Sequence, residues 1–75
     1  MMEKKDLVQL FSDFWQMDPL EVTDGLKLDN ETLKNYSSVR FYQFIAAVES
    51  NFNVKVRNLT KILTFNDLVD NVVPE

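Results

Sequence analysis

Residues 36–52 read YSSVRFYQFIAAVESNF, and this stretch decides the fold. It contains neither Gly nor Pro, and its large apolar side chains recur at helical spacing on one face: Phe41, Phe44, Ile45, Val48 and Phe52. Ser37 and Ser38 stand where this helix would begin, and either hydroxyl can accept a hydrogen bond from an amide of the first turn. We therefore predict a helix over residues 37–52 that packs one face on a core.

A first helix is predicted over residues 3–16, where apolar side chains repeat at the same spacing: Leu7, Leu10, Phe11 and Phe14. The pair Asp18-Pro19 ends it, because the residue before a proline leaves the helical region and proline has no amide hydrogen. Residues 20–36 contain the only glycine and a few isolated leucines. We expect a long ordered loop, with one short turn over residues 29–34.

The carboxyl-terminal third is predicted to hold a short helical turn and a last helix. Residues 54–57 alternate like a strand, yet nothing else in the chain offers a pairing partner, so an extended connector is expected. A turn of helix follows over residues 59–62. Thr64 and Asp67 have the spacing of a capping box and begin the last helix, whose apolar stripe is Phe65, Leu68, Val69 and Val72.

These elements predict an all-α protein, a small three- to four-helix bundle with a long loop between its first two helices. Residues 1–75 are expected to form a single domain, because the chain has about half the length of a typical one. Hydrophobic residues make up 45% of the sequence, enough for a compact core without disulfides or metal.

Composition excludes several classes of function. The absence of Cys and His removes thiolate nucleophiles, histidine bases and the usual zinc ligands, and we expect neither a metal site nor an enzyme. A calcium loop around Gly25 fails because Leu20 and Val22 occupy ligand positions. The net charge of −4 disfavours nucleic acid, and no apolar run suits membrane insertion or a secretory signal. A cytoplasmic protein is predicted.

Several short motifs follow one another along the chain: Glu21-Val22-Thr23, Leu33, Ser38-Val39, Ala47-Val48-Glu49 with Phe52, and Lys61-Ile62 with Thr64 and Phe65. In this order and spacing they resemble the acyl carrier protein family over about residues 7–72. Ser38-Val39 stands where that family has Ser-Leu, inside its Asp-Ser-Leu signature. The resemblance also implies the family's helical bundle.

The resemblance implies that Ser38 carries 4′-phosphopantetheine, transferred from coenzyme A, and that Ser37 is a less favoured attachment point. Acyl groups would be held as thioesters on this arm and shuttled between fatty-acid or polyketide-type enzymes of lipid metabolism. The implied partners are a phosphopantetheinyl transferase and the acyl-loading and ketosynthase-type enzymes. The implied oligomeric state is a monomer.

The departures from the family define the alternatives. Ser37 replaces the family's Asp, and residues 37–51 contain only two charged side chains, so the partner surface is expected to be nearly neutral: Val39, Arg40, Tyr42 and Glu49. One alternative is a carrier-like module that has lost the prosthetic group and binds a partner protein through this helix. Another is an unrelated helical interaction domain, whose last helix would pack differently from the carrier arrangement. The alternative to attachment at Ser38 is that this serine only caps the helix.

Overall fold

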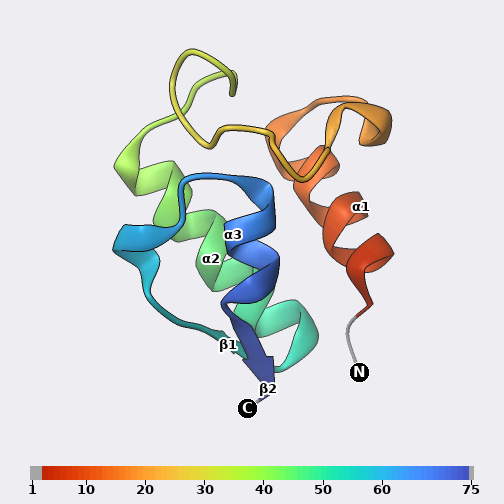
Figure 1. Cartoon of the computed structure of the whole chain (residues 1–75), viewed down its shortest axis with the longest axis vertical. Helices are drawn as coiled ribbons and strands as arrows, with labels where there is room; N and C mark the ends of the chain where they lie inside the picture. The colour runs from red at the N-terminus through yellow and green to blue at the C-terminus, as the bar shows by residue number, and fades with distance from the viewer. Residues whose placement is uncertain (1–2, 75) are drawn as a thin grey trace.

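The computed structural model describes residues 3–74, which form three α-helices, two single-turn 3-10 helices and two short strands (Figure 1). In chain order the elements are α1 (Lys4–Trp15), a 3-10 turn (Pro19–Glu21), α2 (Ser38–Phe52), β1 (Val54–Val56), a second 3-10 turn (Leu59–Lys61), α3 (Phe65–Asp70) and β2 (Val72–Pro74). The predicted positions of the first two helices and the predicted start of the last helix are confirmed, but α3 ends before Val72, which was expected to belong to it.

The ends of α1 and α2 are set by capping hydrogen bonds and by residues in the left-handed backbone conformation. α1 starts with a capping box in which the Glu3 amide donates to Asp6 Oδ2 at 3.2 Å. Its C-cap is Gln16, whose left-handed φ of 55° turns the chain before Pro19. The C-cap of α2 is Asn53, also left-handed with a φ of 54°, a conformation that asparagine tolerates better than most residues.

The prediction of an all-α bundle is wrong, because β1 and β2 pair as a two-stranded antiparallel sheet with Lys55 opposite Val73. The protein is therefore a mixed α/β structure. α3 stops at Asp70, after six residues, and the β-branched Val72 and Val73 continue as a strand rather than as helix. They supply the partner that residues 54–57 were expected to lack.

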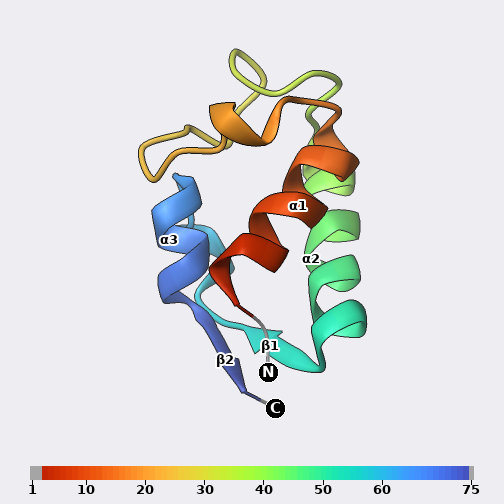
Figure 2. The ribbon, with the colours of Figure 1, turned by 90° about the vertical axis from the view of Figure 1, so that its right-hand side faces the viewer.

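The core lies between the three helices, with α1 seen between α2 and α3 in Figure 2. Phe11 of α1 has no exposed surface, and its ring meets Phe44 of α2 and Phe65 of α3 edge-to-face, at centroid distances of 5.2 and 5.3 Å. The other side chains that are fully buried are Leu7, Val48 and Leu68. One aromatic ring thus joins all three helices.

The long loop is ordered, as predicted, because its first part is bonded to the segment that starts α3. The Leu28 amide donates to the Leu63 carbonyl at 3.0 Å, and the Phe65 amide donates to the Leu26 carbonyl at 2.9 Å. Asp29 then organises the expected turn, because its side-chain Oδ1 accepts hydrogen bonds from the amides of Glu31 and Thr32. Leu28 and Leu33 are buried anchors.

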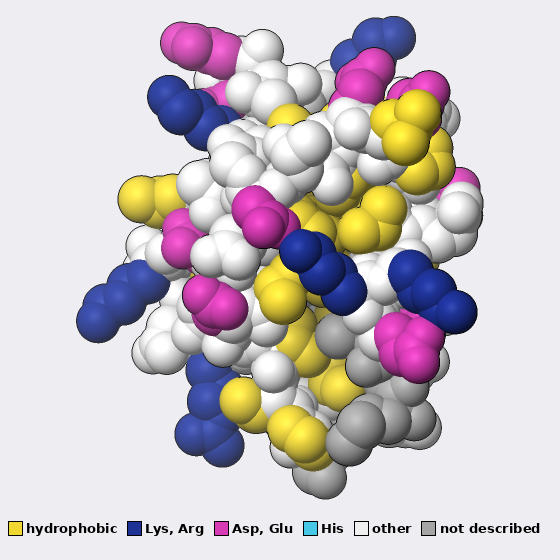
Figure 3. Space-filling model, turned by 45° about the vertical axis from the view of Figure 1, so that its right-hand side comes forward, with side chains coloured by type: hydrophobic (Ala, Val, Ile, Leu, Met, Phe, Trp, Pro, Cys, Tyr) yellow, Lys and Arg dark blue, Asp and Glu magenta, His cyan; other side chains and the backbone are white. Residues whose placement is uncertain are grey.

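Within the described chain, no helix combines the length and the apolar character needed to cross a bilayer. The surface is mixed in charge. Figure 3 shows a strip of apolar side chains on one face, flanked by acidic and basic side chains.

Candidate functional site

The start of α2 places two adjacent serines in different roles. Ser37 is extended, with φ −155° and ψ 165°, and its Oγ accepts a hydrogen bond from the Arg40 amide at 3.1 Å. The Ser37 carbonyl accepts the first helical bond, from the Phe41 amide at 2.9 Å. Ser37 is therefore the N-cap, and the sequence alone had left either serine suited to this role.

Ser38 is the first residue of α2, and it is exposed. Among residues 3–74, its hydroxyl takes part in no hydrogen bond, in contrast to that of Ser37. The amides of a first helical turn lack intrahelical partners and carry the positive end of the helix dipole, which favours an anionic substituent nearby. No acidic residue lies in this turn to repel one.

Two of the four residues predicted as a partner surface are exposed beside Ser38. Val39 retains 66% of its surface and Tyr42 retains 54%. Tyr42 lies one helical turn after Ser38, on the same side of α2. The structure thus brings an aromatic and an aliphatic side chain next to the free hydroxyl.

The other two, Arg40 and Glu49, are engaged in internal contacts. The Arg40 guanidinium lies over the rings of Phe14, at 5.0 Å, and Trp15, at 5.4 Å, and its Nη2 donates to the Phe14 carbonyl at 3.4 Å. Glu49 Oε2 accepts the Val56 amide at 3.0 Å and so joins α2 to β1. Neither side chain is positioned primarily for a partner.

A pocket of about 340 Å³ lies where the end of α1 meets the loop. It is lined by Trp15, Gln16, Met17, Asp18, Glu21, Thr32, Leu33 and Lys34. The Trp15 indole N–H is buried and has no hydrogen-bond partner within the described part of the chain. Sequence reasoning missed this pocket, because residues 32–34 reach Trp15 only through tertiary folding.

Comparison of the chain with family models, with curated proteins and with solved structures finds no match. The likeness to acyl carriers therefore rests on the short sequence motifs, and the functional argument rests on the residues at the start of α2.

Proposed function

We propose that this protein is a carrier in which Ser38 Oγ is the attachment point of a 4′-phosphopantetheine arm. The observation that supports the proposal is the division of roles between the two serines. Ser37 caps α2 through the Arg40 amide, and this leaves the Ser38 hydroxyl exposed and free of hydrogen bonds to residues 3–74.

The attachment is a phosphoryl transfer from coenzyme A. The Ser38 oxygen would attack the phosphorus that bears the pantetheine, a phosphodiester would form, and adenosine 3′,5′-bisphosphate would leave. The hydroxyl proton would pass to a base of the transferase. The phosphodiester anion would then lie at the amino end of a 15-residue helix, where a negative charge is stabilised by about 0.3–1 kcal/mol. When bound, the arm supplies a thiol that holds acyl groups as thioesters.

The two-stranded sheet, which the sequence did not predict, does not affect this site, because it lies at the carboxyl end of α2, opposite Ser38 (Figure 1). β1 begins at Val54, two residues after α2 ends, whereas Ser38 begins the helix. The pairing of β1 with β2 therefore adds support to the carboxyl end of α2 and does not cover Ser38.

The proposed partners are a phosphopantetheinyl transferase and acyl-loading and ketosynthase-type enzymes of fatty-acid or polyketide synthesis in the cytoplasm. Val39 and Tyr42 are the apolar side chains that such enzymes would meet beside the arm. Since the first turn of α2 carries no acid, we expect docking that depends more on apolar contact than on charge and is weakly sensitive to salt.

Intact-mass spectrometry tests the proposal after the full chain is incubated with coenzyme A and a broad-specificity phosphopantetheinyl transferase. We expect one phosphopantetheine mass on the native chain and on Ser37→Ala, and none on Ser38→Ala. Ser37→Asp, which keeps a capping oxygen and supplies the acid of the family signature, should be modified faster. No gain on the native chain, or a gain that persists in Ser38→Ala, would contradict the proposal.

The second candidate is a carrier-like module without the prosthetic group, which binds a partner protein through α2. The exposure of Val39 and Tyr42 favours it. This candidate predicts that the chain purified from its host is unmodified and bound to another protein, and that Tyr42→Lys releases that protein.

A further inference from the structure

We infer that the segment from β1 to the second 3-10 turn binds an acidic peptide segment of a partner protein. The surface consists of three cations, Lys55, Arg57 and Lys61, and we name it the basic edge. It is separate from the apolar side chains beside Ser38, and the inference does not depend on the proposed carrier function. Three observations carry it: the distribution of charge along the chain, the lack of ion pairs, and the hydrogen-bonded backbone of this segment.

Positive charge is concentrated in one part of an acidic chain. Residues 50–66 contain these three cations and no acid, whereas the rest of the chain has five cations and twelve acids, a net charge of −7. Lys55 and Arg57 point to the same side, because side chains two residues apart in an extended segment do so. Lys61 ends the 3-10 turn that follows. Figure 1 shows this stretch along one side of the molecule.

The three cations are available to a partner. All are exposed, and none forms an ion pair or a side-chain hydrogen bond with residues 3–74. The acid that precedes them, Glu49, is directed to the Val56 amide, which donates to its Oε2 at 3.0 Å. Lys4, in contrast, is paired with Asp24 at 2.7 Å. The basic edge therefore carries charge that no direct contact within the described chain neutralises.

Hydrogen bonds hold the backbone that presents these cations. Lys55 lies in the paired part of the sheet, and the Arg57 amide donates to the Asn71 carbonyl at 2.9 Å. The Lys61 amide donates to the Asn58 carbonyl at 2.8 Å, and the Asn58 side chain donates to Asn71 Oδ1 at 2.9 Å. Because this backbone is already ordered, a partner that binds it loses less conformational entropy.

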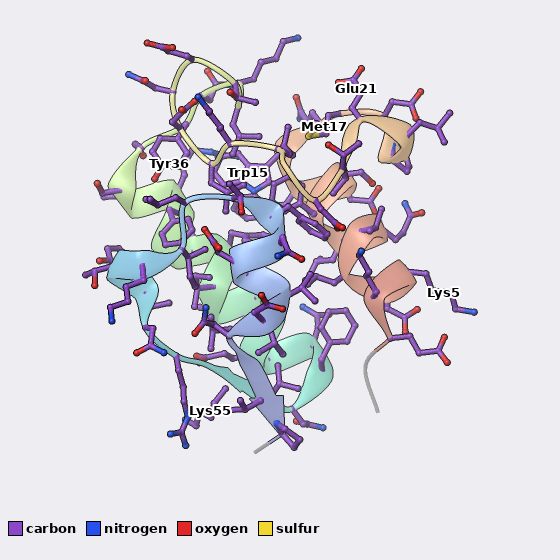
Figure 4. All side chains as sticks on the ribbon, viewed as in Figure 1. Lys5, Trp15, Met17, Glu21, Tyr36 and Lys55 are labelled. Atoms are coloured by element: carbon purple, nitrogen blue, oxygen red, sulfur yellow. The ribbon has the colours of Figure 1, made fainter. Side chains whose placement is uncertain are left out.

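An extended acidic peptide matches the spacing of the cations. The Cα atoms of Lys55 and Arg57 are about 6.6 Å apart, which is also the distance between alternate residues of an extended peptide. Carboxylates on alternate residues of such a peptide would therefore face the two cations together. Figure 4 shows Lys55 beside β1, at the opposite end of the view from Tyr36 and Glu21. A peptide bound there leaves the long loop uncovered.

Larger polyanions fit this surface less well. The molecule measures only 31 × 24 × 19 Å, so a nucleic acid or an anionic membrane that contacts the basic edge also approaches the acids of the rest of the chain and is repelled. Recognition of anionic lipids by basic clusters typically uses about four to eight cations, more than this surface has. A short peptide segment can contact the basic edge alone.

NMR titration of the ¹⁵N-labelled full chain tests the inference. The probe is acetyl-Glu-Ser-Glu-Ser-Glu-amide at low ionic strength, and its control has Gln in place of each Glu. We expect the amide signals of residues 55–61 to shift saturably with the acidic peptide, with an affinity of about millimolar, and not with the control. Equal shifts with both peptides, or shifts confined to other residues, would overturn the inference.

A matched pair of variants separates the basic edge from the net charge of the chain. Lys55→Glu and Lys34→Glu each reverse one exposed lysine, and Lys34 lies in the long loop. Lys55→Glu should weaken binding of the acidic peptide by about twofold or more, and Lys34→Glu should leave it nearly unchanged. Lys61→Glu should act like Lys55→Glu, and it does not alter the sheet. Equal effects of the reversals at residues 34 and 55 would contradict a localised site.

Two further probes separate a protein partner from other polyanions. Vesicles of phosphatidylserine and phosphatidylcholine, or a single-stranded oligonucleotide, replace the peptide at the same concentration of negative charge. We expect both to change the signals of residues 55–61 less than the acidic peptide does. A larger response to either probe would overturn the assignment to an acidic peptide. All these titrations use the unmodified chain, so their outcome does not depend on whether Ser38 accepts the arm.

Discussion

At the scale of single residues, the neighbouring serines of α2 should respond differently to the same substitution. Ser37→Ala removes the oxygen that accepts the Arg40 amide, and it should lower the free energy of unfolding by about 1 kcal/mol. Ser38→Ala removes no hydrogen bond within residues 3–74 and should change it by less than about 0.5 kcal/mol. Urea denaturation followed by Trp15 fluorescence measures both. Equal losses would contradict the assignment of the cap to Ser37.

Asp67 gives the protein an acid-sensitive contact at the start of α3. The hydrogen bond from the Leu63 amide, 3.0 Å long, holds the pKa of this carboxyl below its usual range. Partial desolvation opposes the effect, and the amide and side chain of Thr64 lower the pKa further. Because the pKa is lower in the folded state, the contact stabilises the protein at neutral pH, and this stabilisation is lost as the pH falls below about 4.

Asp67→Asn should therefore flatten the dependence of unfolding free energy on pH in the acid range. Asp70→Asn, in the same helix but outside the capping box, serves as the control and should keep the native dependence. Urea denaturation at a series of pH values between about 2 and 6 measures the slopes. An unchanged slope in Asp67→Asn would rule out the linkage.

At the scale of elements, the helices were predictable from sequence, because their apolar spacing and caps are local. α1 and α2 differ from the predicted ranges by one residue at most at each end, and the capping box of Thr64 and Asp67 is present. The sheet was not predictable in this way. Its strands have three residues each and lie far apart in the chain, and Val72 also fits the stripe of a longer α3.

The buried side of β1 should contribute measurably to stability. Val56 retains 8% of its surface, and its amide is held by Glu49, whereas Lys55 is exposed. Val56→Ala should lower the free energy of unfolding by about 2 kcal/mol, and Lys55→Ala by less than about 0.5 kcal/mol. Denaturant titration distinguishes them, and similar effects of the two substitutions would argue against the observed orientation of the strand.

At the scale of the whole molecule, stability depends on the core, in which the Phe11 ring connects α1 with α2 and α3. Phe11→Ala should cost about 3–5 kcal/mol, a large share of the roughly 4–11 kcal/mol typical of a domain of this length. Phe11→Leu should cost less, because it leaves a smaller cavity. Thermal unfolding followed by circular dichroism measures both, and a native-like Tm for Phe11→Ala would contradict the central position of this ring.

The candidate site was only partly predictable for the same physical reason that the sheet was missed. Ser38 is marked by its place at a helix start, which is a local signal. The internal role of Arg40 and the pocket around Trp15 arise only when segments distant in sequence pack together. The Glu49 contact joins residues only seven apart, but it depends on the turn of the chain from α2 into β1.

The loop over residues 20–36 is held by hydrogen bonds in its first part but not near its end, which affects where a protease can cut. Leu26 and Leu28 are bonded to the start of α3, whereas the amides of residues 34–36 donate no backbone hydrogen bond to the described chain, and Lys34 is exposed. Brief trypsin digestion should therefore cut first after Lys34, since the other basic residues lie in or beside ordered elements. The carboxyl-terminal fragment would begin at Asn35 and carry Ser38 as its fourth residue, so its mass would report directly on whether that hydroxyl is occupied.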